Sequence, residues 1–362
     1  MGHTRRILQA VVFLICTAAL IITGPQYTGL QEKEIIMTDP PETTVQTTAK
    51  ITKETTKGSE IYDIILTFAG DTTLGQDEDY TWNRFDSYAE NNDAGYFFEK
   101  VSSVFKNDDF TFLNLEGPLT SSDSIEPKEF NFKGDPLYVR ILKEGSIEGV
   151  TLANNHILDY GTEGLEETVN VLKNNDILYT HYEDHFVIEI KDIRIAYLGY
   201  MGWSGESRSL KHLKKVVLEL REEGVDYITA NFHWGTEHQY YPDENQKRMA
   251  YFAIDNGVDL VIGHHPHVLQ GKEIYKGKTI IYSLGNFCFG GAPHPYDYDT
   301  IIYQKKLTIK DGRITEENDV IIPARVSGTP DKNNYQPIIA EGEEAKRIQD
   351  KFDGLIIDLD EQ

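Results

Sequence analysis

The most reactive side chains of the sequence follow directly after short apolar stretches. The clearest case is His264-His265-Pro266-His267, which comes after the apolar residues 260–263. Three histidines in four residues are hard to explain by packing, and imidazole is a common ligand of transition metals. In an extended segment, residues i and i+2 face the same way, so we expect His265 and His267 to converge while His264 points elsewhere. Pro266 stiffens this presentation.

Four other apolar stretches end in potential ligands of the same kind. Residues 61–70 precede Asp71, 110–115 precede Glu116, 149–153 precede Asn154-Asn155-His156, and 227–232 precede His233. Taken singly, each polar residue has an ordinary explanation as a turn former, a helix cap or a buried histidine. Together, imidazole, carboxylate and amide groups form a mixed donor set that suits Zn, Mn or Fe better than Ca.

This donor set predicts a site for one or two divalent metal ions. Two carboxylates and several neutral donors could hold two ions about 3.5–4 Å apart, which bind the attacking and leaving oxygens of a displacement and generate hydroxide near neutral pH. His156 follows the candidate amide ligand Asn155 and is the best candidate for a proton donor.

The elements that must position these residues alternate along the chain. Besides the apolar stretches, we expect a hairpin at 186–190 and 193–198, a strand at 279–284, and helices at 162–174, 212–223, 244–256 and 341–352. Such alternation predicts a mixed α/β fold with helices on the faces of the sheet. Ligands of open α/β sheets collect beyond the carboxyl ends of strands, where the polar residues stand here.

The composition excludes several other classes of protein. The chain has 362 residues, with 40% hydrophobic residues, 21 Tyr and 16 Phe, which rules out global disorder. Its net charge of −24, without a basic stripe, argues against nucleic-acid binding. Cys16 and Cys288 are the only cysteines, so a cysteine-rich metal site is excluded.

Residues 1–24 are typical of a targeting segment. Arg5 and Arg6 precede an apolar run at 7–22, which predicts an uncleaved signal anchor or a cleaved signal peptide, with a buried core helix as the third possibility. The run ends without a clear small-residue cleavage site, which favours the anchor. The arginines would stay cytoplasmic, so we expect a single-pass cell-membrane protein with its main domain extracytoplasmic; the alternative is a secreted protein.

The rest of the chain divides into three expected parts. Residues 25–60 are rich in Thr and Pro and predict a disordered linker. Residues 61–325 would form the main domain, and residues 326–362 a C-terminal extension partly packed on it.

Six motifs in this order resemble a known family. They are FAGDTTLG (68–75), NLEGPLT (114–120), LANNHILDYG (152–161), NFHWGTEH (231–238), IGHHPHVLQG (262–271) and IYSLGNF (281–287). The sequence resembles the bacterial capsule-synthesis CapA family, which includes the poly-γ-glutamate synthesis proteins. That family is similar to calcineurin-like metallophosphoesterases, so the resemblance implies a four-layer α/β/β/α sandwich around a dimetal site.

The resemblance also implies roles for single residues. It assigns metal ligation to Asp71, Glu116, Asn155, His233, His265 and His267, and proton donation to His156. Glu237 and Asn286 would orient the ligands, although Asn286 could equally shape a turn. The first motif departs from the Asp-x-His pattern of the phosphoesterases, because Thr73 stands where the histidine would be. One metal would therefore lack a histidine ligand.

Two functions follow from this resemblance, with a purely structural metal site as a third possibility. The first is a membrane-anchored accessory of a capsule or poly-γ-glutamate synthase complex, whose metal centre binds an anionic polymer. The alternative is an active hydrolase of a phosphoester or related bond, with metal-bound hydroxide as nucleophile and His156 as general acid. The charge of −24 repels a polyanion at long range, but a local metal centre could still capture a carboxylate.

Overall fold

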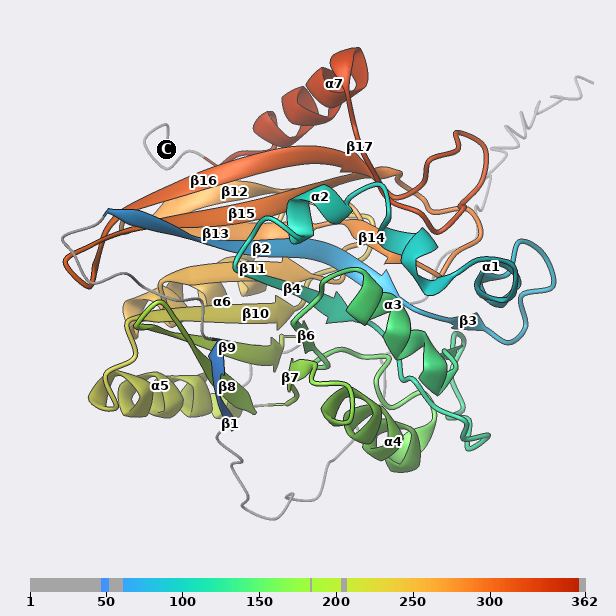
Figure 1. Cartoon of the computed structure of the whole chain (residues 1–362), viewed down its shortest axis with the longest axis horizontal. Helices are drawn as coiled ribbons and strands as arrows, with labels where there is room; N and C mark the ends of the chain where they lie inside the picture. The colour runs from blue at the N-terminus through green and yellow to red at the C-terminus, as the bar shows by residue number, and fades with distance from the viewer. Residues whose placement is uncertain (1–46, 52–60, 183, 203–206, 358–362) are drawn as a thin grey trace, which may run out of the picture. The chain divides into compact units, whose positions relative to one another are not determined.

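The computed structural model describes residues 47–51, 61–182, 184–202 and 207–357 (Figure 1). They form a mixed α/β fold, which confirms the predicted class. The first large sheet contains β1 (Thr47–Ile51), β8 (His185–Ile190), β9 (Ile193–Met201), β10 (Tyr227–His233), β11 (Leu260–His264), β13 (Lys278–Leu284) and β12 (Leu269–Tyr275), in that order.

The second large sheet has eight strands. Its order is β17 (Ile338–Ile339), β16 (Arg313–Arg325), β15 (Asp299–Lys310), β2 (Tyr62–Thr73), β4 (Phe110–Leu115), β6 (Gly149–Thr151) and β7 (Leu178–Thr180), and β14 (Asn286–Phe289) pairs with β2. A small ribbon joins β3 (Gln76–Asp77) to β5 (Phe132–Lys133). The neighbours β2, β4, β6 and β7 are parallel, as are β9, β10, β11 and β13, so the carboxyl ends of each set lie at one edge.

The two large sheets share one hydrophobic core. Phe112 on β4 and Tyr197 on β9 lie with ring centroids 4.9 Å apart, and Phe68 on β2 packs against the same tyrosine. Strands buried on both faces read as continuous apolar runs, and every residue of β4 and β10 is buried. This packing fixes how the ends of the two sheets meet.

Helices cover the other faces of the sheets. On the first sheet, α5 (Ser207–Glu222) and α6 (Glu244–Asp255) bury Leu213, Val217 and Ala250 against residues of β10, β11 and β13. The second sheet packs on its outer face against α1 (Phe85–Asn91), α2 (Ser102–Phe105), α3 (Val139–Glu144), α4 (Gly161–Lys173) and the 3₁₀ turns η1 (Ala94–Phe98) and η2 (Pro136–Tyr138). The last helix, α7 (Gly342–Asp353), lies at the top of Figure 1 above β16. Its residues Ile348 and Phe352 belong to the hydrophobic core that the two sheets share.

The N-terminal predictions fall mostly outside the described residues. The anchor or signal at 1–24 lies outside them, and no helix within the described ranges is long and apolar enough to cross a membrane. Of the linker expected at 25–60, the structure describes only 47–51, which pair with β8 as strand β1 instead of standing apart.

Candidate metal centre

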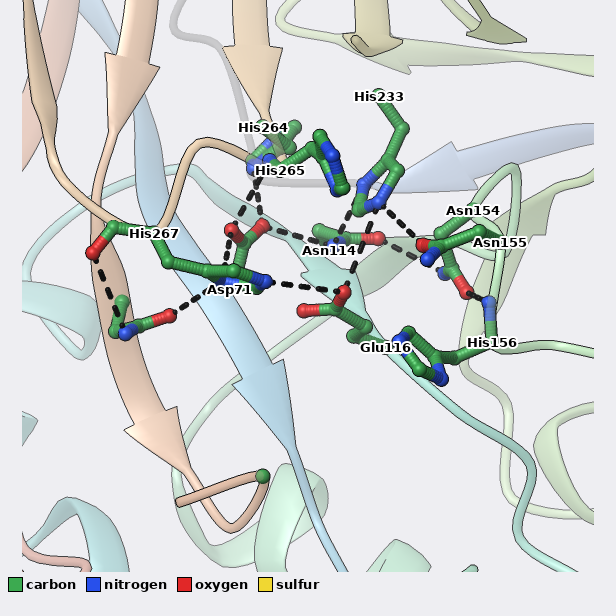
Figure 2. Close-up of polar contacts among 12 residues, drawn as sticks. Asp71, Asn114, Glu116, Asn154, Asn155, His156, His233, His264, His265 and His267 are labelled. Atoms are coloured by element: carbon green, nitrogen blue, oxygen red, sulfur yellow. Dashed lines mark hydrogen bonds and ion pairs between the residues drawn. The ribbon is translucent and has the colours of Figure 1, made fainter. Parts of the chain in front are cut away.

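The predicted ligands meet where the strands of the two sheets end (Figure 2). Asp71 lies near the end of β2 and Glu116 directly follows β4, in one sheet. His233 ends β10, in the other sheet. All three side chains are 0% exposed. The two sheets therefore bring carboxylates and imidazoles together in a buried site.

Asp71 sits at the centre of this cluster. Its Oδ1 accepts a hydrogen bond from Asn114 Nδ2 at 2.8 Å and lies 3.3 Å from His264 Nδ1. Its Oδ2 accepts from the backbone N–H of His265 at 3.0 Å and lies 3.3 Å from His267 Nδ1. Burial by itself would raise the pKa of Asp71, but His264 and His267 hold it well below its usual range. Asp71 is therefore an anion.

Glu116 has a very different environment. Its Oε1 lies 3.6 Å from His233 Nε2 and 3.8 Å from His267 Nε2. Among the residues that the structure describes, neither of its carboxylate oxygens has a hydrogen-bond partner. Burial raises its pKa well above the usual range, because an ionised carboxylate without hydrogen bonds is costly in the interior. A divalent cation would satisfy both oxygens, so this carboxylate fits a metal site.

The histidine segment after β11 is not extended, contrary to the sequence-based expectation. His265 and His267 have φ angles of 95° and 56°, in the left-handed region that non-glycine residues rarely adopt. Their rings still face the same cluster, with centroids 5.7 Å apart. The expectation that His264 points elsewhere is wrong, because this residue is buried beside Asp71. Backbone strain of this kind concentrates at functional sites.

The charges of the histidines differ. Burial lowers the pKa of His233 and His265 well below the usual value, so both are neutral and offer nitrogen lone pairs. Burial acts on His267 in the same direction, but the Glu116 and Asp71 carboxylates outweigh it and raise the pKa of His267 to about 10.

Three groups of side chains have the spacing of a metal site. In each group, one ligand atom from every residue lies within 4.8 Å of the others. The groups are Glu116, His233 and His265; Asp71, Glu116 and His267; and Glu237, His265 and His267. Five of the six predicted ligands thus belong to such groups, and Glu116 is common to two of them.

Asn155 and His156 lie at the side of this cluster (Figure 2). The Oδ1 of Asn155, the sixth predicted ligand, is 2.8 Å from His233 Nε2. His156 stacks on Phe132 with ring centroids 4.1 Å apart, and its Nδ1 lies 2.7 Å from Asp159 Oδ2. Lys128 forms an ion pair with the other oxygen of Asp159. Burial lowers the pKa of His156, which favours its neutral form.

Sequence reasoning missed Asn114, and it considered Asn154 only as a potential ligand or a turn residue. Asn114 lies between Asp71 and His233, with its Nδ2 3.3 Å from His233 Nδ1, and its Oδ1 accepts from Asn154 Nδ2 at 3.0 Å. Both asparagines stand within two residues of a predicted ligand in the quoted motifs, and this proximity was the available signal. Asn286 accepts a hydrogen bond from His267 Nδ1 at 2.8 Å, which agrees with the orienting role expected for it.

The fold and this cluster define a mixed α/β protein with buried histidine, carboxylate and amide groups at the ends of two sheets. The family model "Bacterial capsule synthesis protein PGA_cap" matches residues 65–291. The chain belongs to this family, as the order of its motifs suggested.

Several curated proteins are similar to the chain. Capsule biosynthesis protein CapA of Bacillus anthracis is 29% identical over 259 residues, covering 64% of this chain and 61% of that protein. PGA biosynthesis protein CapA of Bacillus subtilis is also 29% identical, covering 65% of this chain and 66% of the relative. The matches thus span less than two thirds of these relatives' own lengths.

Two further similarities are more remote. A "Probable polyglutamine synthesis accessory protein" of Mycobacterium tuberculosis is 26% identical over 208 residues, covering 49% of this chain and 55% of the relative. The solved structure of a hypothetical protein from Thermus thermophilus is 15% identical with a TM-score of 0.45, covering 72% of this chain and 99% of that one.

Proposed function

We propose that the protein takes part in the synthesis or export of a capsule or of poly-γ-glutamate, as a membrane-anchored accessory that acts through a divalent metal centre. The names of its relatives in the two Bacillus species support the pathway. The proposed partners are a synthase complex and an anionic polymer or phosphoester.

The observation that best supports a metal centre is the environment of the buried Glu116 carboxylate. Within the described part of the chain, this buried carboxylate has no hydrogen-bond partner and faces two histidines, an arrangement that does not stabilise a fold by itself. Together with Asp71, His233, His265 and His267, it offers the nitrogen and oxygen donors that Mn, Zn or Fe prefer. A bound divalent ion would act as a Lewis acid toward a phosphoryl or carboxylate oxygen.

The second candidate function is hydrolysis, and the environment of His156 favours it. Its Nδ1 faces a buried carboxylate at 2.7 Å, the arrangement that orients an imidazole for proton transfer from its other nitrogen. In this function, the metal ligands would bind the anionic group of a phosphoester. His156 would protonate the leaving oxygen from its imidazolium form, which the Asp159 carboxylate stabilises against the opposing effect of burial. Two sheets with a shared core and helices outside also support the four-layer α/β/β/α arrangement of metallophosphoesterases.

We further propose that the N-terminal segment anchors the protein to the cell membrane, with the main domain extracytoplasmic. Arg5 and Arg6 before the apolar run at 7–22 support this orientation. Secretion after cleavage is the alternative. Protease treatment of intact cells and the apparent mass of the mature chain distinguish these fates from a cytoplasmic location.

The first experiment measures metal in the full chain, purified in mild detergent, by elemental analysis. We expect one or two equivalents of a transition metal, and loss of metal in Asp71→Ala and His265→Ala. A chain that holds no metal, even after Mn²⁺ or Zn²⁺ is supplied, would refute the metal centre.

A second experiment separates the two functions. In a strain that lacks the protein, His156→Ala should restore the capsule if the protein is an accessory that only binds. Failure to restore it, together with loss of turnover of a phosphoester while metal is retained, would favour the hydrolase.

A further inference from the structure

The third group of potential ligands contains a residue that lies outside the buried cluster. Glu237 is exposed, in the segment between β10 and α6, whereas its two partners His265 and His267 are 5% and 8% exposed. A carboxylate oxygen of Glu237 and one nitrogen from each ring lie within 4.8 Å of one another. This carboxylate therefore approaches the buried cluster from the solvent side.

The backbone around Glu237 is hydrogen-bonded to the turn that carries His265 and His267, called the histidine turn below. The N–H of the next residue, His238, donates to the carbonyl of Pro266 at 2.8 Å, and His238 adopts a left-handed φ of 60°. One residue further, the carbonyl of Gln239 accepts from Gln270 Nε2 at 2.8 Å. These bonds connect the segment to the turn itself, at Pro266, and to strand β12, which follows the turn. The position of Glu237 is thus built into the fold.

Side-chain contacts reinforce this attachment. The His238 ring stacks on Tyr296 with centroids 4.3 Å apart. Tyr240 donates from its hydroxyl to Asp297 Oδ2 at 3.1 Å, and Lys351 of α7 pairs with the same carboxylate. The segment is therefore held from the histidine turn, from the loop before β15 and from the C-terminal helix.

The two histidines near Glu237 each belong to one of the buried ligand groups as well. His265 also belongs to the group with Glu116 and His233, and His267 to the group with Asp71 and Glu116. Glu116 belongs to both of these groups and is buried. Glu237 is exposed and lies near one histidine of each group, His265 and His267. The buried groups contain two carboxylates, so a third would offset more of the charge of one or two divalent ions.

We propose that Glu237 is a further metal ligand, which closes the centre from the solvent side. This inference rests on the metal centre proposed above. Because the residue is exposed, its carboxylate is also the ligand that an incoming anionic group can displace without disturbing the buried donors.

The test is a Co²⁺ titration of the full chain, followed by calorimetry and visible absorption, with Glu237→Gln and the control Glu244→Gln. Glu244 is also exposed, with 91% side-chain exposure, and belongs to no metal-binding group within the described residues. We expect Glu237→Gln to weaken Co²⁺ binding at least about tenfold, the loss that even the partner of a ligand can cause. The Co²⁺ absorption bands should change as well, while Glu244→Gln matches the wild type.

Three results would overturn the inference, and they have different meanings. If the wild type binds Co²⁺ and Glu237→Gln binds it equally well, Glu237 is no ligand and the metal centre stands without it. If affinity falls but the absorption bands stay unchanged and the difference disappears at high salt, Glu237 acts only through its charge. If the wild type binds no Co²⁺, the proposed metal centre fails together with this inference.

Discussion

His156 Nδ1 lies 2.7 Å from Asp159 Oδ2, and the same carboxylate oxygen accepts a hydrogen bond from the backbone N–H of Phe132 at 2.6 Å. Its other oxygen pairs with Lys128. Asp159 is fully buried and thereby joins the loop that carries His156 to the ribbon strand β5. The orientation of the His156 ring is set by this carboxylate together with the stacking on Phe132.

Asp159→Asn should therefore destabilise the protein. The variant keeps the side-chain shape but removes the charge that three donors share. Breaking a fully buried pair costs about 3–5 kcal/mol, and because the Lys128 side chain is 29% exposed we expect a loss of about 2–4 kcal/mol. Urea unfolding, followed by circular dichroism, measures this loss. The control is Asp123→Asn, because Asp123 also contacts a lysine, at 3.3 Å, but its side chain is 95% exposed. The control should change stability by less than about 0.5 kcal/mol, and equal losses in the two variants would contradict the prediction.

A close backbone contact beside Asp71 leads to a second prediction. A Cβ on Gly70 would lie 2.0 Å from the carbonyl oxygen of Gly285, which accepts the N–H of Asp71 at 2.9 Å. Neither backbone can move away easily, so Gly70→Ala should lower the free energy of unfolding by about 3 kcal/mol or more, the upper end for overpacking. Thermal melts of the full chain provide the measurement.

Gly95 is the matched control for this substitution. A Cβ at Gly95 would meet nothing within 4 Å, so Gly95→Ala should leave the melting temperature within a few degrees of the wild type. A Gly70→Ala variant that melts like Gly95→Ala would contradict the prediction, because it would show that the backbones at Gly70 and Gly285 can move apart without loss of stability.

The sequence predicted well the strands that are buried on both faces. The expected strand at 110–115 coincides with β4, and the stretches that end in Asp71 and His233 are β2 and β10, because such strands read as uninterrupted apolar runs. The long hairpin of β15 and β16 was missed, since charged residues interrupt its pattern. One of them, Lys305, is 3% exposed at its side chain and pairs with Asp319 at 2.6 Å.

Only part of the candidate site could be predicted from the sequence. Residue type and position at strand ends were enough to find Asp71, Glu116 and His233, which the structure brings together. The conformation of the segment after His264 could not be deduced, because it contains left-handed φ angles at His265 and His267 that only the tertiary structure stabilises.

A half-buried histidine outside the cluster gives a pH-dependent prediction. Burial lowers the pKa of His181 from 6.5 to about 4, and its Nε2 has no hydrogen-bond partner among the described residues. Because the folded pKa lies below the unfolded one, this residue costs no stability above about pH 6.5 and destabilises the fold as the pH falls toward 4. His181→Phe should therefore gain up to about 1 kcal/mol relative to the wild type between pH 7.5 and 5.5.

Urea unfolding of both proteins at the two pH values checks this difference. Other buried histidines make the wild type and the variant less stable in acid alike, so only the change in the gap between them is informative. Either of two results would contradict the prediction: a constant gap would show that the fold leaves the pKa of His181 unchanged, and a gap that widens in favour of the wild type at pH 5.5 would show that the fold raises it.

The last prediction concerns Asn114, which connects the ligands without being one of the predicted set. Its Nδ2 donates to Asp71 Oδ1 at 2.8 Å and lies 3.3 Å from His233 Nδ1. Given the proposed metal centre, Asn114→Ala should weaken Mn²⁺ binding by about 10–100-fold, because the ligands on two different strands lose their common support. Calorimetric titration of the full chain measures the change.

Asn231 supplies the control, since it is 1% exposed on β10 and its Nδ2 donates to the carbonyl of Leu198 at 3.2 Å. This side-chain hydrogen bond within the described residues does not involve a predicted ligand. Asn231→Ala also removes a buried amide, so its free energy of unfolding should fall by about 1–3 kcal/mol, as in Asn114→Ala. Its Mn²⁺ affinity should stay unchanged. If both variants lose affinity in proportion to their stability, the effect of Asn114 comes from the fold as a whole. If only Asn114→Ala loses affinity, the amide acts on the ligands themselves.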